Sequence, residues 1–338
     1  MYVETPCVVL DMEKVHRNLQ RMADICQRNH CGLRPHTKTH KIPELAKLQI
    51  EYGAAGITVA KLSEAEVMAD HGITDIFMAY PLIGESRIRR AIALSRRIRL
   101  ICAADCLESA EAISRLCRAE GAVLELRLEV DTGMHRTGIP YETALQEALR
   151  IAALPGVRLQ GLFTFRGMMY DGETCLDRRK CAHQEGSLMA ALAEEIRKEG
   201  IPIQDVSVGS TPTAEFCAEV PGVTEVRPGT YIFQDMMQVN TSACESTLED
   251  VAATVWTQVV SCCKPDVIVV DSGCKSLSTD AAPGKFPYSL RGYGTVAGYP
   301  ELSLSRLSEE HGMLDLERPC PSIHVGDILR IIPNHICP

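Results

Sequence analysis

The sequence predicts a (β/α)₈ barrel followed by a smaller, mostly β domain. Short apolar runs typical of buried strands alternate with longer amphipathic segments over the first two thirds of the 338 residues. Eight such strand–helix units fit into about 215 residues, which is the length that a barrel of this kind needs. After about residue 240 the alternation stops, and β-type runs separated by Gly, Pro and Ser follow. An open, doubly wound α/β sheet is the alternative architecture.

The strands of the predicted barrel can be assigned in order along the chain. They are expected at residues 32–38, 56–60, 75–80, 98–103, 124–130, 159–165, 205–209 and 224–229. Between them lie helical patterns, for example at 107–121, where apolar residues recur at helical spacing and Gly121 ends the pattern. The later β-type runs are 253–262, 266–273 and 322–332. We therefore expect an N-terminal strand at 1–11 that joins the β domain, a barrel over 12–240 and the β domain over 241–338.

Composition and charge exclude several classes of protein. The formal net charge is -9, whereas a general nucleic-acid binder needs a broad basic surface. No apolar run is long enough for a transmembrane helix, and the first residues lack the pattern of a secretory signal. Fifteen cysteines without paired CxxC motifs are expected to be reduced thiols. The sequence thus predicts a cytoplasmic protein that binds neither nucleic acid nor membranes.

Residues 34–41 read RPHTKTHK and crowd five basic or imidazole side chains together in an acidic chain. Among them, Lys38 falls at the end of the first predicted strand, and functional groups of βα barrels gather at the C-terminal ends of strands. Neighbouring positive charge and partial burial favour the neutral, nucleophilic amine. We therefore predict that Lys38 is a catalytic lysine that forms a Schiff base, rather than a solvated surface charge.

A Schiff-base cofactor such as pyridoxal 5′-phosphate needs a phosphate-binding loop, and two candidates occur late in the barrel. One follows the strand at 205–209, the other follows the strand at 224–229, and barrels often bind phosphate after strands seven and eight. Backbone N–H groups, hydroxyls and a helix N-terminus would hold the anion. Each turn alone is also compatible with simple helix capping. The candidate residues are Gly209, Ser210, Thr211, Gly229, Thr230 and Tyr231.

Two further motifs contain residues suited to binding a cofactor or a metal. In EVDTGMHRTG, a strand runs into a turn with two glycines, and Arg136 could reach an anionic cofactor oxygen or form a surface ion pair. Near the C-terminus, His335 and Cys337 stand two residues apart. In an extended segment such residues project to the same face, so an imidazole and a thiolate can share one zinc ion.

Taken together, the ordered motifs resemble the D-threonine aldolase and D-serine dehydratase family, which are pyridoxal-phosphate enzymes of fold type III with an alanine-racemase-like barrel. The matching motifs span almost the whole chain: TPCVVLD, RPHTKTHK, DTGMHRTG, VSVGSTPT, EVRPGTYIFQD, DSGCKSLSTD, SEEHG and PNHICP. One departure is the pair Gly167-Met168, where the family often has Gly-His.

The resemblance implies a role for each candidate residue. Lys38 would carry pyridoxal phosphate with His36 beside it, and Arg136 would hydrogen-bond the phenolic oxygen of the cofactor. Tyr170 would approach the ring nitrogen, although the departure at residues 167–168 lies close to it. His335 and Cys337 would hold a divalent ion, Zn²⁺ or Mn²⁺. The phosphate would lie among Ser210, Thr211, Gly229, Thr230 and Tyr231.

The resemblance also implies the reaction class. The expected activity is a pyridoxal-phosphate- and metal-dependent lyase reaction on D-3-hydroxy amino acids. Dehydratases of the family resemble the His-x-Cys pattern and aldolases His-x-Asp, so Cys337 favours a dehydratase of the D-serine ammonia-lyase type over a D-threonine aldolase. An amino-acid racemase and a non-catalytic pyridoxal-phosphate carrier are further alternatives. A homodimer is expected, in which each β domain completes the barrel mouth of its neighbour.

Overall fold

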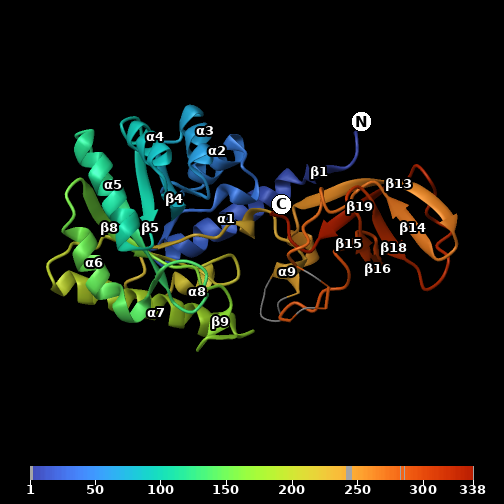
Figure 1. Ribbon diagram of the computed structural model, residues 1–338. Helices are drawn as coiled ribbons and strands as arrows, with labels where there is room; N and C mark the ends of the chain where they lie inside the picture. The colour runs from blue at the N-terminus through green and yellow to red at the C-terminus, as the bar shows by residue number, and fades with distance from the viewer. Residues whose placement is uncertain (1–2, 241–245, 282, 285, 338) are drawn as a thin grey trace. The chain divides into compact units, whose positions relative to one another are not determined.

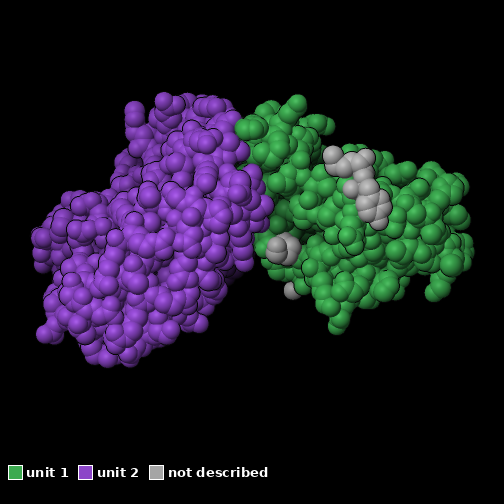
Figure 2. Space-filling model, turned by 90° about the horizontal axis from the view of Figure 1, so that it is seen from above, with its two compact units in different colours: residues 1–19, 230–338 green, residues 20–229 purple. Residues whose placement is uncertain are grey.

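The computed structural model describes residues 3–240, 246–281, 283–284 and 286–337. The chain divides into two compact units, which Figure 2 shows in different colours. Unit 1 combines residues 1–19 with residues 230–338, and unit 2 comprises residues 20–229. Helix α1 (Met12–Arg28) begins in unit 1 and ends in unit 2.

Unit 2 is built on a parallel sheet of eight strands in the order β2-β12-β11-β8-β6-β5-β4-β3. Figure 1 labels β4, β5 and β8 of this sheet. A parallel bridge between His36, just beyond β2, and Thr58 of β3 joins the two ends of this order. The strands are β2 (Gly32–Leu33), β3 (Ile57–Val59), β4 (Asp75–Pro81), β5 (Arg99–Ala104), β6 (Leu124–Asp131), β8 (Val157–Phe163), β11 (Asp205–Val208) and β12 (Glu225–Val226). The predicted barrel fold is therefore confirmed.

Helices follow the strands along the chain, and Figure 1 shows α4, α5 and α6 along the outer side of the sheet. Helix α5 buries Ala110, Ile113 and Leu116, the apolar face expected from the sequence. The helices between strands are α2 (Pro43–Glu51), α3 (Leu62–Asp70), α4 (Glu85–Ser95), α5 (Leu107–Ala119), α6 (Ala144–Ala152), α7 (Arg178–Lys198) and α8 (Ala214–Cys217). Strand β7 (Ile139–Pro140) pairs with β6, and β9 (Met169–Tyr170) forms a hairpin with β10 (Glu173–Thr174).

One cluster inside unit 2 is apolar and close-packed. The rings of Phe77 and Phe163 meet edge to face with centroids 4.9 Å apart, and Ile101 and Ala103 complete the cluster. Aromatic pairs in this geometry contribute about 0.5–1.5 kcal/mol beyond the area that they bury. The sheet therefore surrounds a packed core, and the chemistry must lie at the ends of its strands.

A buried ion network occupies the N-terminal end of this sheet. Glu225, the first residue of β12, accepts hydrogen bonds from Arg127 (2.5 Å) and Arg34 (2.9 Å). Arg127 also reaches Asp205 (2.9 Å), and Arg34 reaches Asp75 (2.5 Å); these aspartates begin β11 and β4. Burial opposes ionisation of Glu225, but the two guanidinium groups hold the pKa of its carboxyl well below the usual range. The network fastens together strands that are far apart in sequence.

We expect Glu225→Gln to lower the free energy of unfolding at pH 7 by about 3–5 kcal/mol, because it removes the buried anion that the two guanidinium groups share and leaves them only the partly exposed carboxylates of Asp75 and Asp205. The folded-state pKa of Glu225 is depressed, so its stabilisation is present above the unfolded pKa of about 4.3 and is lost as pH falls. The difference in free energy of unfolding between the wild-type protein and Glu225→Gln should therefore fall by about 2 kcal/mol from pH 7 to pH 3. Denaturant unfolding at both pH values measures it. The exposed pair Glu85–Arg89 supplies the control, since Glu85→Gln should cost less than about 1 kcal/mol.

Unit 1 contains an antiparallel sheet in the order β16-β15-β19-β13-β14-β18-β17, and β1 pairs with β13. One face carries an apolar core that includes Val255, Ile331 and Leu314. The strands are β1 (Cys7–Leu10), β13 (Ala253–Lys264), β14 (Val267–Val270), β15 (Gly294–Val296), β16 (Tyr299–Ser303), β17 (Arg306–Leu307), β18 (Gly312–Asp315) and β19 (Ile328–Pro333). Unit 1 also holds the short helix α9 (Met236–Val239). The predicted β domain is confirmed, with four strands, β15 to β18, beyond the three long runs seen in the sequence.

The cysteines and the helices of the described residues were also compared with the sequence analysis. Their fourteen cysteines are all free thiols. None of their helices combines the length and the apolar character that crossing a membrane requires.

Candidate functional site

Lys38 lies in a single 3₁₀ turn, Thr37–Thr39, just beyond β2. The sequence placed it at the end of a strand. Sheet-like hydrogen bonds continue to His36, whose N–H donates to the Pro228 carbonyl (3.0 Å), and the turn that carries Lys38 begins at the next residue. The hydroxyl of Thr37 donates to the Thr58 carbonyl (3.1 Å) and fixes the turn against β3. The Lys38 side chain is exposed, with its Nζ 6.0 Å from the centre of the Phe165 ring.

The basic side chains around Lys38 do not form one cationic patch. Arg34 faces the buried network at the other end of the strands, and Lys41 pairs with Glu64 (3.3 Å). Burial, together with the charges of Lys38 and Arg227, holds the pKa of His36 well below its usual range. The backbone N–H of Lys38 donates to Nδ1 of His36 (3.3 Å). A ring nitrogen that accepts a hydrogen bond carries no proton, so this contact agrees with a neutral ring. The His36 ring is therefore an uncharged neighbour of Lys38.

Phe165 brings Lys38 and Arg136 to one place. It follows β8, and the Arg136 guanidinium lies 4.8 Å from the centre of the same ring that Lys38 approaches. The loop that carries Arg136 is shaped by Asp131, which accepts from the N–H groups of Gly133 (2.9 Å) and His135 (3.1 Å). An amine and an exposed guanidinium thus share one aromatic platform.

The two predicted phosphate loops also meet beside the Lys38 turn. The Gly229 N–H donates to the hydroxyl of Thr211 (3.2 Å), and Ser210 is held by Thr213 (3.0 Å). A Cβ on Gly229 would lie 3.0 Å from the Thr39 hydroxyl and 3.2 Å from the His36 carbonyl oxygen, so a larger residue here would push the loop away from the Lys38 turn. The structure therefore gathers Ser210, Thr211 and Gly229 around the turn that carries Lys38.

Arg227 is a buried cation of this region that the sequence analysis quoted within a motif but did not assign. It donates to the Ser207 hydroxyl (2.7 Å) and to the Thr164 carbonyl (2.5 Å). Burial lowers its pKa to about 10, which leaves it charged at neutral pH. An arginine directly after the short strand Glu225–Val226 and two residues before the candidate phosphate-binding Gly229 was the signal that could have identified it.

Three other residues predicted to bind the cofactor, Thr230, Tyr231 and Tyr170, make contacts other than those around the Lys38 turn. Thr230 and Tyr231 belong to unit 1, in a 3₁₀ turn over Thr230–Ile232, and both are buried. The Thr230 hydroxyl contacts the Cys337 sulfur (3.6 Å). Tyr170 lies in the β9–β10 hairpin, and Lys180 of α7 packs over its ring at 4.9 Å. The contacts of Tyr170 therefore place it against the first turn of α7.

The chemistry of this donor set suits pyridoxal phosphate. Lys38 offers an amine for the aldehyde, and Arg136 and Arg227 offer positive charge for an anionic ring oxygen and a phosphate. The hydroxyls of Ser210 and Thr211 and the close approach at Gly229 fit a phosphate-binding loop. These residues could hold the cofactor.

His335 and Cys337 lie beyond β19 in unit 1, and burial alternates along their segment. Asn334 and Ile336 are buried, whereas His335 and Cys337 are half-buried, so the two candidate ligands project to the same side. The His335 ring hydrogen-bonds the Cys337 side chain. Burial opposes charge on His335, but Cys337 with the carboxylates of Asp235 and Asp280 raises its pKa to about 9.

This pair fits a divalent ion with two protein ligands. A tetrahedral zinc ion holds a nitrogen and a sulfur ligand about 3.5 Å apart, which is also the reach of a hydrogen bond to sulfur. Among the residues that the structure describes, no group of three or more His, Cys, Asp or Glu side chains could hold a metal ion. His335 and Cys337 would therefore leave coordination positions open, as metals that act on substrates require.

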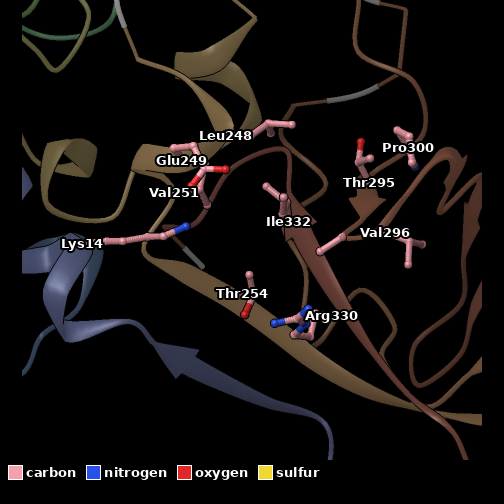
Figure 3. Close-up of a pocket in the computed structure, with 12 residues that line it drawn as sticks. Lys14, Leu248, Glu249, Val251, Thr254, Thr295, Val296, Pro300, Arg330 and Ile332 are labelled. Carbon is pink, nitrogen blue, oxygen red and sulfur yellow. The ribbon is translucent and has the colours of Figure 1, made fainter.

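The pocket drawn in Figure 3 is a different feature of unit 1. Lys14 of α1 and Arg330 of β19 line it together with Glu249, Thr254 and Thr295. The described residues of its lining include none of the side chains predicted for the cofactor or the metal.

Two family models match the chain. The alanine racemase N-terminal domain matches residues 10–236, and the putative serine dehydratase domain matches residues 252–338. Each region coincides with a part of the chain that carries one of the two candidate sites, Lys38 in the first and His335 with Cys337 in the second.

Relatives match over almost the full length. D-threo-3-hydroxyaspartate dehydratase of Delftia sp. strain HT23 is 35% identical, over 99% of this chain and 91% of its own. D-threonine aldolase of Arthrobacter sp. is 30% identical, over 99% and 86%. The solved structure of the Delftia dehydratase has a TM-score of 0.90 at 34% identity, with 99% and 91% covered. A cysteine-to-alanine mutant of that enzyme in the metal-free form has a TM-score of 0.89, with the same identity and coverage.

Proposed function

Because the chain belongs to the fold type III pyridoxal-phosphate enzymes that join an alanine racemase N-terminal domain to a serine dehydratase domain, we propose that it is a dehydratase of D-3-hydroxy amino acids, of the D-serine ammonia-lyase type. Loss of water from such a substrate, followed by hydrolysis, yields a keto acid and ammonia. The proposed enzyme uses pyridoxal phosphate and a divalent ion, Zn²⁺ or Mn²⁺.

One observation favours a dehydratase over an aldolase. The candidate metal ligands are an imidazole and a thiol that already contact each other, His335 and Cys337. A thiolate selects zinc-like ions, which act as Lewis acids at neutral pH. The relative with 35% identity is a D-threo-3-hydroxyaspartate dehydratase, and a structure of a cysteine-to-alanine mutant of a D-threo-3-hydroxyaspartate dehydratase was solved in the metal-free form.

The candidate residues for the cofactor each have a separate role in the proposed reaction. When bound, pyridoxal phosphate supplies an electron sink for negative charge at Cα, and the metal ion supplies Lewis-acid assistance to the departing 3-hydroxyl. Lys38 holds the cofactor and then accepts the proton from Cα. The neutral His36 ring adds no positive charge next to that amine. Arg136 and Arg227 would hold the anionic groups of the cofactor and balance their charge.

Retro-aldol cleavage is the second candidate, because a D-threonine aldolase is 30% identical over nearly the whole chain. It needs the same lysine and metal but removes the proton from the 3-hydroxyl, and it releases glycine and an aldehyde. The two reactions therefore differ in their products rather than in their binding residues.

Product analysis separates these activities. The purified protein, loaded with pyridoxal phosphate and zinc, would be given D-serine, D-threonine and D-3-hydroxyaspartate in parallel, with L-serine as the control. We expect ammonia and a keto acid in equal amounts from the D substrates. Glycine with an aldehyde would identify an aldolase. Bound cofactor without turnover of any substrate would indicate a non-catalytic carrier.

A further inference from the structure

The backbone that carries His335 and Cys337 is fastened on both sides. The buried amide of Asn334 donates to the carbonyls of Ala281 (3.0 Å) and Gly292 (2.7 Å). The Ile336 N–H, between the two candidate ligands, donates to Asp235 (3.2 Å), which is fully buried. The main chain is therefore set by Asn334 and Asp235, and the orientation of the His335 ring depends on what holds the ring itself.

A chain of polar contacts holds that ring. The Ser278 hydroxyl donates to Oδ1 of Asp280, and Oδ2 of Asp280 lies 2.7 Å from Nδ1 of His335. The ring in turn hydrogen-bonds Cys337. Ser278 and Asp280 belong to the motif DSGCKSLSTD, which neither the cofactor site nor the metal ligands explain. The contacts thus lead from that motif to the thiol.

We propose that Asp280 is the positioning residue of the candidate metal ligand His335. When a metal ion displaces one proton from the ring, the carboxylate, which accepts but cannot donate, keeps the remaining proton on Nδ1. The lone pair then lies on Nε2, the nitrogen available to a metal ion, and the contact also fixes the rotation of the ring. This inference rests on the proposed metal-dependent function and names the residue that prepares the site.

The alternative is an ordinary surface ion pair. The Asp280 side chain is 61% exposed and that of His335 24% exposed, and ion pairs at the surface typically contribute about 0–1 kcal/mol to stability. The two interpretations differ in what they expect of the metal, because an ordinary pair has no effect on zinc affinity. The exposure also means that removal of Asp280 should leave the fold intact.

The test is the affinity of the full-length, cofactor-loaded protein for Zn²⁺ alone, measured by competition with a chromophoric chelator. Asp280→Ala should weaken zinc binding by about 10- to 100-fold, the range found for residues that orient metal-bound histidines. Asp280→Glu, which keeps a carboxylate, should recover part of the loss. A matched control is Asp327→Ala, since Asp327 pairs with the exposed His324 at 3.7 Å and should have no effect.

A spectroscopic signature distinguishes positioning from general loosening. In the zinc-loaded protein with ¹⁵N-labelled histidine, the Nδ1–H of His335 should be protected from exchange with water, and Asp280→Ala should remove this signal. The unfolding midpoint of the metal-free protein should be the same for both. Wild-type zinc affinity in Asp280→Ala, alongside a large loss in Cys337→Ala, would overturn the proposal for Asp280 alone. Wild-type affinity in Cys337→Ala would instead overturn the proposed metal-dependent function.

Discussion

Replacing Lys38 with alanine should abolish ammonia release from D-serine and end the covalent hold on pyridoxal phosphate. The variant loses both the amine that bonds the aldehyde and the base that accepts the Cα proton. Loss of a positioned base alone lowers a rate by about 10²–10⁴-fold, so the combined loss should leave no measurable turnover. Absorption in the visible band of the lysine-bound cofactor and an ammonia assay measure the two effects separately.

Lys41 provides the matched control for this experiment. It is another lysine of the same motif, it is exposed, and it pairs with Glu64 (3.3 Å). Lys41→Ala should keep both the visible band and most of the activity. A Lys38→Ala protein that retained the band would show that another lysine carries the cofactor.

Replacing Cys337 with alanine should remove zinc and, with it, dehydration, while cofactor binding survives. The substitution removes one of only two candidate protein ligands, and hydroxide is a poor leaving group without Lewis-acid help. Lys38, Ser210, Thr211 and Gly229 belong to unit 2. Thr230 contacts the Cys337 sulfur (3.6 Å) but keeps its own hydroxyl in the variant, so the visible band should be unchanged. On one preparation, metal analysis measures bound zinc, absorption measures bound cofactor and the ammonia assay measures dehydration. Wild-type protein stripped by a chelator should behave like the variant and recover when Zn²⁺ is restored.

Two further variants sharpen this test. Cys337→Asp offers a carboxylate oxygen, which suits harder ions such as Mn²⁺, and should shift the metal preference and raise glycine formation relative to ammonia. Cys263→Ala removes an exposed thiol of the same unit and should change nothing. Undiminished dehydration by a metal-free Cys337→Ala protein would refute the metal role.

The barrel could be predicted because its pattern is local. Each parallel strand is a short apolar run next to an amphipathic helix, and α5 appears where helical spacing placed it. The first strand was predicted to include Lys38, but its sheet-like hydrogen bonds end at His36, and the 3₁₀ turn Thr37–Thr39 follows. Strands β15 to β18 are short and separated by turns, so their periodicity is too brief to recognise.

Contacts between distant residues lie outside what a single sequence shows. Arg127 and Glu225 meet across 98 positions, and Asp280 reaches His335 across 55. The RPHTKTHK motif suggested a cluster of positive charge around Lys38, but folding sends Arg34 into a buried network and leaves His36 neutral. Sequence motifs therefore predicted the candidate side chains, but they did not predict the distant residues that determine the charge of those side chains.

Two expectations stay predictions: the homodimer, implied by the family resemblance, and the cytoplasmic location, inferred from the composition of the sequence. The homodimer, with each β domain at the barrel mouth of its neighbour, calls for light scattering of the active protein. The cytoplasmic location calls for fractionation of cells that produce it.

Borohydride reduction followed by peptide mapping tests the central claim most directly. Reduction converts the bond between a lysine and pyridoxal phosphate into a stable secondary amine, so the attachment site can be read from the peptide that carries the added mass. The account predicts a single modified peptide with the label on Lys38 and none on Lys41. Label on any other lysine, or no label on protein that contains the cofactor, would contradict it.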